Sequence, residues 1–197
     1  MRKIHIALVA FLFISASCPG CLSLKEAYVP QDLLINGWYE DFKDEEKGSS
    51  FFGMEKWSTK VYKKGEFAYL SVTSIKFIVM SGREELLEKV ESDIKHQAAK
   101  YGIEVEPESR ISGERKNARG HETSFVIYTG KKNSHLYRFI GEVWSCSKSG
   151  ISVICMGFAD ISEIDGIEGW KKIVGDPEGS IEGIEDSNGL IYNVVCH

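Results

Sequence analysis

The chain has 197 residues, of which 43% are hydrophobic and 27% charged, and its formal net charge is −5 at pH 7. These values are typical of globular proteins and exclude a collagenous, low-complexity or grossly disordered chain. Loss of an N-terminal leader would remove Arg2 and Lys3 and no acid, which leaves 22 basic and 29 acidic side chains and a net charge of −7. We therefore expect one domain of ordinary size that binds no nucleic acid and is not drawn to anionic lipid by its overall charge.

The first residues have the composition of an export signal. Arg2 and Lys3 are basic, residues 6–14 are continuously apolar, and Ser15, Ala16 and Ser17 are small residues before a cysteine. These are the three regions of a secretory signal peptide, and the apolar run is about half as long as a bilayer-spanning helix.

The end of this segment resembles the lipobox of prokaryotic lipoproteins, in which a cysteine becomes the first mature residue and carries a lipid. Cys18 directly follows the small residues and is slightly favoured, and Cys21, which follows Gly20, is the alternative. The resemblance implies an exported protein that is lipid-anchored on the outer face of the cytoplasmic membrane or the cell surface. The same segment is compatible with secretion without a lipid and with an uncleaved anchor.

Residues 1–21 are thus predicted to be a leader, 22–32 a tether and 33–197 a single α+β domain. An amphipathic helix is predicted from Ser81 to Gly102, because apolar residues recur at helical spacing and Ser81 and Glu84 have the spacing of a capping box. A shorter helix is predicted within residues 162–175. The expected strands cover residues 33–42, 55–62, 66–80, 103–112, 121–129, 135–146, 151–160 and 190–196.

The second and third of these strands have the pattern of a hairpin, and the run from Gly120 to Asp160 has the pattern of a three-stranded antiparallel meander. The predicted fold class is therefore α+β, with a mostly antiparallel sheet of about six to eight strands on which one long and one shorter helix pack. The order is similar to the PsbP-like fold from about Gly37 to Val174, most of all over residues 108–160. The resemblance implies that the domain binds or stabilises a partner protein, and it carries over no catalytic residue.

Three cysteines lie in predicted strands, namely Cys146, Cys155 and Cys196. Disulfides persist outside the cell, so these residues are candidates for a disulfide, with Cys196 as a partner for Cys155 or Cys146. Cys21 joins them if Cys18 carries the lipid, and buried free thiols are the alternative to a disulfide. A nucleophilic cysteine would need a nearby base, for which His121 and His135 are the candidates.

Metal ligands are also present in the sequence, but their spacing matches no closed zinc motif. His121 and His135 begin adjacent strands, and with Glu122 or Glu142 they offer ligands for a transition metal, although histidines at strand ends are mostly surface residues. The acidic run from Asp160 to Asp186 offers carboxylates without the spacing of a helix–loop–helix calcium site. No metal and no cofactor is therefore predicted. A small basic patch is expected near one loop, from Arg110, Arg115, Lys116 and Arg119.

The sequence contains no Gly-rich phosphate loop, no Gly-x-Ser-x-Gly elbow and no His-Glu-x-x-His. We therefore expect a non-catalytic binding or assembly module with an unidentified protein partner at the cell surface and a lipid anchor in the membrane. A second hypothesis is an extracytoplasmic hydrolase or thiol enzyme that uses Cys155 or Cys146 with His121. A third is a domain that binds a small ligand.

Overall fold

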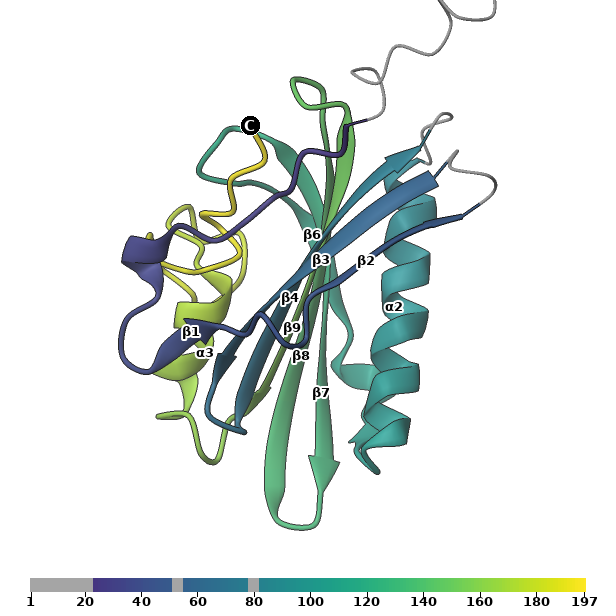
Figure 1. The fold of residues 1–197 in the computed structure, drawn as a ribbon. Helices are drawn as coiled ribbons and strands as arrows, with labels where there is room; N and C mark the ends of the chain where they lie inside the picture. The colour runs from purple at the N-terminus through teal and green to yellow at the C-terminus, as the bar shows by residue number, and fades with distance from the viewer. Residues whose placement is uncertain (1–22, 51–54, 78–81) are drawn as a thin grey trace, which may run out of the picture.

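The computed structural model describes residues 23–50, 55–77 and 82–197 (Figure 1). The expected leader, with Cys18 and Cys21, lies outside the described residues, and so does Ser81 of the expected capping box. Within the described ranges, no helix is long and apolar enough to cross a membrane.

Nine strands of the described residues form one sheet, and every pairing between them is antiparallel. Their order is β1-β3-β4-β9-β8-β7-β5, with β2 also paired to β3 and β6 to β7. The α+β class is as predicted, while the sheet has more strands than the expected six to eight. The strands are β1 (Trp38–Glu40), β2 (Glu46–Ser50), β3 (Glu55–Lys64), β4 (Ala68–Phe77), β5 (Glu104–Val105), β6 (Ile111–Lys116), β7 (Glu122–Lys132), β8 (His135–Cys146) and β9 (Ile151–Asp160).

The central strands follow the sequence patterns closely. Strands β3 and β4 form the predicted hairpin, whose turn contains Gly65 at a φ of +58°. Strands β7, β8 and β9 pair in succession, which confirms the three-stranded antiparallel meander. These elements depend on alternating side chains and short turns, both of which are local properties of the sequence.

The long helix α2 (Arg83–Lys100) covers one face of the sheet, over β7, β8 and β9 (Figure 1). Its inward stripe consists of Leu86, Val90, Ile94 and Ala98, all buried. The helix approaches β8 so closely that a Cβ on Gly141 would overlap the side chain of Val90. Two short 3-10 helices complete the regular elements, η1 (Gln31–Leu33) and η3 (Pro107–Ser109).

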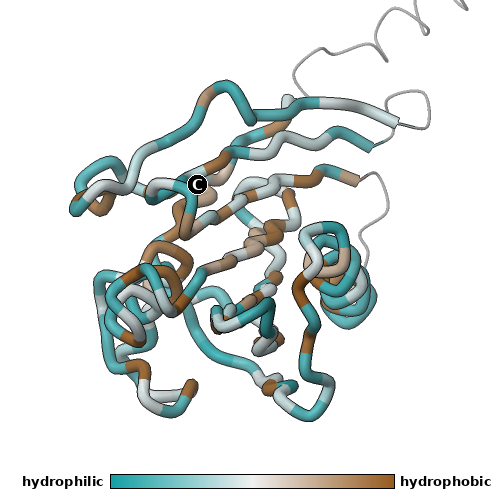
Figure 2. Tube along the Cα trace, turned by 90° about the horizontal axis from the view of Figure 1, so that it is seen from below, coloured by the Kyte–Doolittle hydropathy of each residue, from teal (hydrophilic) through white to brown (hydrophobic). Residues whose placement is uncertain are grey.

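The opposite face is covered by helix α3 (Ile167–Val174) and by the irregular C-terminal segment, residues 175–197 (Figure 2). No strand forms over residues 190–196, contrary to the prediction. The backbone N–H groups of Leu190, Ile191 and Tyr192 instead donate to the carbonyls of Lys172, Ile173 and Val174. The segment therefore satisfies the last carbonyls of α3, which a helix leaves without partners of its own.

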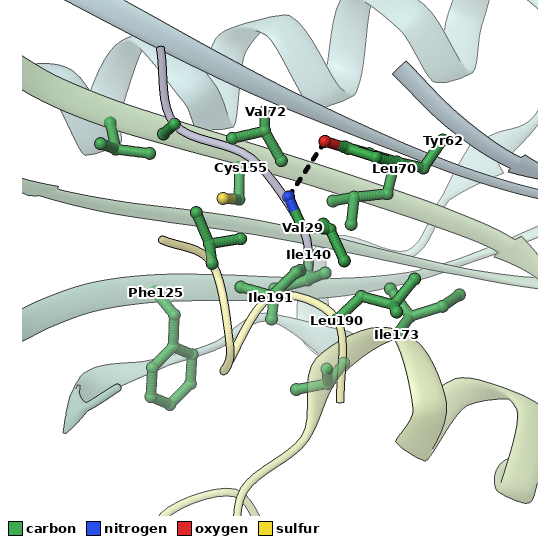
Figure 3. Close-up of a cluster of buried hydrophobic side chains, with 14 of the residues drawn as sticks. Val29, Tyr62, Leu70, Val72, Phe125, Ile140, Cys155, Ile173, Leu190 and Ile191 are labelled. Carbon is green, nitrogen blue, oxygen red and sulfur yellow. Dashed lines mark hydrogen bonds between the residues drawn. The ribbon is translucent and has the colours of Figure 1, made fainter. Parts of the chain in front are cut away.

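Residues from Ala27 onward belong to the folded domain. Ala27 and Val29 are 1% exposed, and Tyr28 between them pairs with Val195. The N–H of Val29 donates to the hydroxyl of Tyr62 over 3.0 Å, within the apolar cluster of Figure 3. Because these side chains fill the core, the expected tether over residues 22–32 ends before Ala27.

Candidate metal centre

Two cysteines and two histidines meet at the end of the molecule where the chain terminates. Their possible ligand atoms all lie within 4.8 Å of one another, and the residues are His121, Cys146, Cys196 and His197. Nε2 of His121 is 3.2 Å from Sγ of Cys196. Nδ1 of His197 is 3.4 Å from Sγ of Cys146 and 3.6 Å from Sγ of Cys196.

These separations are those of a tetrahedral zinc site. With metal–sulfur bonds of about 2.3 Å and metal–nitrogen bonds of about 2.0–2.1 Å, tetrahedral angles place a sulfur about 3.5 Å from a nitrogen. The three sulfur–nitrogen distances of 3.2, 3.4 and 3.6 Å bracket that value. Three of the six separations between the four ligand atoms therefore agree with a tetrahedral site, and the other three are at most 4.8 Å.

Three separate segments bring the four residues together. Cys146 ends β8, and its carbonyl accepts the N–H of Gly150 over 2.8 Å, which closes the turn into β9. His121 precedes β7, and its N–H donates over 3.0 Å to the Asn117 side chain, which orders the loop. Cys196 and His197 directly follow Val195, the residue of the C-terminal segment that pairs with Tyr28. Backbone contacts in each segment thus bring the four residues to the same place.

The surroundings of Cys146 favour the thiolate, the form that binds metals. Burial raises the pKa of the thiol, but hydrogen bonds from Cys196, from the Ser149 hydroxyl and from the backbone N–H groups of Ser149 and Lys148 outweigh it and lower the pKa overall. The Ser149 hydroxyl is buried and has no other partner among the described atoms. The Cys146 sulfur therefore lies among hydrogen-bond donors.

Cys196 differs, because burial and then the neighbouring Cys146 raise its pKa to about 12. The indole N–H of Trp144 acts in the opposite direction on the same sulfur. That N–H is buried and has no conventional hydrogen-bond partner in the described part of the chain. A thiolate bound to a cation at Cys196 would supply an acceptor for it, since hydrogen bonds around a metal site commonly support the ligands.

Both histidines are biased toward the neutral form, which is the form that coordinates metals. Burial, followed by the charges of His197 and Lys148, lowers the pKa of His121. Desolvation and the charges of Lys148, Arg119 and Lys25 lower the pKa of His197. The His121 and His197 rings meet edge-on, with centroids 5.4 Å apart.

The structure separates Cys155 from the other two cysteines. All three are free thiols in the structure. In the register of β8 and β9, Cys155 lies opposite Glu142, whereas Cys146 lies opposite Ile151. Burial raises the pKa of Cys155 well above its ordinary value. A disulfide stays a prediction, and the sulfur atoms of Cys146 and Cys196 lie within 4.8 Å of each other.

His121 and His135, considered as a possible pair of metal ligands, do not lie together. His135 lies at the closed end of the β7–β8 hairpin, opposite Lys132, while His121 precedes the open end. Nδ1 of His135 is 2.7 Å from an Asp160 carboxylate oxygen. Since the two strands are antiparallel, starting positions of successive strands lie at opposite ends of the hairpin.

The carboxylates considered in the sequence are also engaged elsewhere. Glu142 is fully buried in an ion pair with Arg115, and Glu122 pairs with Lys116 over 3.3 Å. In the acidic segment, the buried Asp176 accepts the N–H of Ile181, and Asp186 accepts the N–H of Asn188. No calcium-like cluster of carboxylates forms in the described ranges.

Sequence reasoning missed the cluster because its ligands are as far as 51 and 75 positions apart. The adjacent Cys196 and His197 were the one local signal, since neighbouring residues of these types offer two ligands from one short segment.

Comparison with protein-family models, with curated proteins and with solved structures finds no match for this chain. The similarities to prokaryotic lipoproteins and to the PsbP-like fold therefore stay predictions from the sequence.

Proposed function

We propose that this chain is an exported, lipid-anchored protein whose domain binds one zinc ion through Cys146, Cys196, His121 and His197. The observation that carries the metal site is the convergence of four ligand atoms within 4.8 Å from three segments. Two thiolates and two imidazoles suit zinc, which accepts tetrahedral sites of this composition.

The proposed role of the ion is structural and not catalytic. Four protein ligands close the coordination sphere, whereas a catalytic zinc keeps a position open for water or substrate. The ion would join the C-terminal segment to β8 and to the loop before β7, so metal binding and the docking of this segment would be coupled. This role agrees with a binding or assembly module that has a protein partner at the cell surface.

Export and lipid anchoring come from the leader. The lipobox-like cysteines Cys18 and Cys21 precede the first described residue, Ser23, by only a few positions. With the tether ending before Ala27, the lipid would hold the domain close to the membrane. An intact mass spectrum of the native chain from a membrane fraction tests this, since a lipid on either cysteine adds its mass to the chain.

Metal content of the purified full chain tests the site. We expect one zinc per chain after reduction and exposure to zinc, and a Co²⁺-loaded form with the absorption of a tetrahedral thiolate complex. Cys146→Ser and Cys196→Ser should each lose the ion. Cys155→Ala is the matched control, because it removes a buried thiol outside the cluster.

A folded reduced chain that binds no zinc, or Cys146→Ser and Cys196→Ser variants that bind as well as the control, would contradict the proposal. A disulfide between Cys146 and Cys196 in the native chain, with no metal, would assign the pair to the disulfide predicted from the sequence.

A thiol enzyme is the second candidate, favoured by the 3.2 Å contact between Sγ of Cys196 and Nε2 of His121. Such an enzyme requires an accessible thiolate beside a base. Cys155 does not meet this requirement, because it is fully buried and its pKa is raised. Rapid alkylation of Cys146 or Cys196 in the zinc-treated native chain would favour the enzyme, and protection by zinc would favour the metal site.

A further inference from the structure

The described chain begins at the same end of the molecule as the metal centre. In Figure 1 the first described residues and the C-terminus lie at the same end of the sheet. The Ser23 carbonyl accepts a hydrogen bond from Lys76 at the end of β4, and Glu26 pairs with Lys47 of β2. A lipid carried by Cys18 or Cys21 would therefore bring this end of the domain to the membrane.

Three exposed cations from three segments surround His197 at this end. They are Lys25 of the N-terminal segment, Arg119 of the loop before β7 and Lys148 of the β8–β9 turn. Nζ of Lys148 is 3.1 Å from Nε2 of His197. Lys25 lies three residues before Tyr28, whose pairing with Val195 places the N-terminal segment beside the one that ends at His197. Arg119 lies two residues before His121, whose ring meets that of His197. Among the described residues, none of these three cations has a carboxylate within ion-pair distance, while nearby Glu26 and Glu122 pair with Lys47 and Lys116.

This patch is not the one that the sequence suggested. Of the four basic residues expected to gather near one loop, Arg110 pairs with Glu91, Arg115 is buried against Glu142, and Lys116 pairs with Glu122. Of these four, Arg119 alone has no carboxylate partner in the described structure. The fold places Lys25 and Lys148, from distant segments, at the same end as Arg119. The domain is acidic overall, so this cationic end is the part that an anionic surface would attract.

We propose that Lys25, Arg119 and Lys148 contact the phosphates of anionic phospholipid headgroups, so that the anchored domain stands with its metal centre at the membrane surface. This inference rests on the anchoring in the proposed function. From Cys21 to Lys25 the chain spans at most about 14 Å, at roughly 3.5 Å per residue. A lipid at Cys21 therefore places Lys25 within reach of the headgroup layer.

Lys148 stays available to a phosphate while it contacts His197. An ammonium has three hydrogen-bond donors, and Nε2 of His197, 3.1 Å from Nζ, can accept only one of them.

The test uses the full lipidated chain in vesicles of phosphatidylcholine, alone or mixed with phosphatidylglycerol. Surface amines are modified with an uncharged reagent, and each lysine is quantified by peptide mass spectrometry. Lys89 and Lys100, which are exposed on α2, are the internal controls. Basic residues near an anionic surface gain about fivefold in affinity each at low salt. We therefore expect modification of Lys25 and Lys148 to fall about fivefold or more relative to the controls with phosphatidylglycerol, and to recover in high salt.

The paired substitution Arg119→Ser and Lys148→Ser should restore the modification of Lys25, and Lys89→Ser with Lys100→Ser should not. Equal modification of Lys25 in neutral and anionic vesicles would overturn the inference, and so would protection that persists in neutral vesicles. The intact mass of the chain distinguishes failure of the lipid anchoring from failure of the headgroup contact. A chain without lipid overturns the anchoring and this inference with it, whereas a lipidated chain with unprotected lysines overturns this inference alone.

Discussion

Two polar clusters connect the part of the chain after β9 to the sheet, and they differ in how completely their polar atoms are satisfied. The first is buried around Arg115, whose guanidinium pairs with both carboxylate oxygens of Glu142, at 3.0 and 2.5 Å. It also donates to the carbonyls of Val174 and Gly175 at the end of α3. The Thr123 hydroxyl donates to Glu142 over 2.7 Å. This cluster is complete in itself.

The second cluster, at His121, Cys146, Cys196 and His197, is incomplete. The adjoining Trp144 indole N–H and Ser149 hydroxyl are buried with no partner but a cysteine sulfur among the described atoms, and two free thiols face two imidazoles. Buried polar groups in native proteins usually have partners, so each exception needs an explanation. The comparison indicates that the Arg115 cluster is structural and that the Cys/His cluster is suited to bind a cation.

The largest effect is expected from breaking the complete cluster. Arg115→Met leaves the Glu142 carboxylate buried without its charge partner, which should lower the free energy of unfolding by about 3–5 kcal/mol. The double variant Arg115→Met/Glu142→Leu should lose less than the single variant, because no unpaired charge remains. Urea unfolding measures both. Arg110→Met, which removes a surface partner of Glu91, is the control and should cost less than about 1 kcal/mol. A single Arg115 variant as stable as this control would contradict the structural role.

The incomplete cluster should respond to metal and not to substitution alone. Zinc at a free concentration of about 100 times its dissociation constant should raise the free energy of unfolding by about 2.7 kcal/mol, if it binds only the folded chain. Cys146→Ser should abolish that increase, while Arg115→Met should keep it in whatever fraction remains folded. Urea unfolding with and without zinc is the measurement. An equal increase in the Cys146→Ser variant would place the ion elsewhere.

The sequence predicted the elements whose signals are local. Alternation and turns predicted β7, β8 and β9, and helical spacing predicted α2 within two residues at each end. Strand β2 was missed because Glu46–Ser50 is polar and contains Gly48. The structure explains the glycine, since a Cβ there would overlap the ring of Trp57 on β3.

Tertiary partners decided what the sequence could not. Residues 190–196 have the composition of a strand, yet their backbone groups satisfy the carbonyls of α3. The candidate site depends on the same docking, because it brings Cys196 and His197 to Cys146, which ends a strand 50 positions earlier. Arg115 has the sequence context of a loop cation, and only the fold shows that it is buried.

The smallest expected effect concerns an ion cluster on the opposite side of the sheet, which extends the comparison to a polar group in contact with water. Glu91 of α2 accepts hydrogen bonds from the hydroxyl of Tyr128, from Lys95 over 2.9 Å and from Arg110 over 3.2 Å. The Tyr128 bond, opposed by partial burial and supported by the two cations, lowers the pKa of Glu91 from 4.5 to about 2.

A carboxylate with a lowered pKa in the folded state stabilises the protein above the pKa of the unfolded state, and this contribution is lost as the pH falls from about 4.5 toward 2. Because solvent screens the pair, Glu91→Gln should cost at most about 1 kcal/mol at neutral pH and progressively less in acid. Glu88→Gln, exposed one turn earlier on the same helix, is the control and should show no such pH dependence. A pH-independent loss in Glu91→Gln would assign the side chain a packing role and not an electrostatic one.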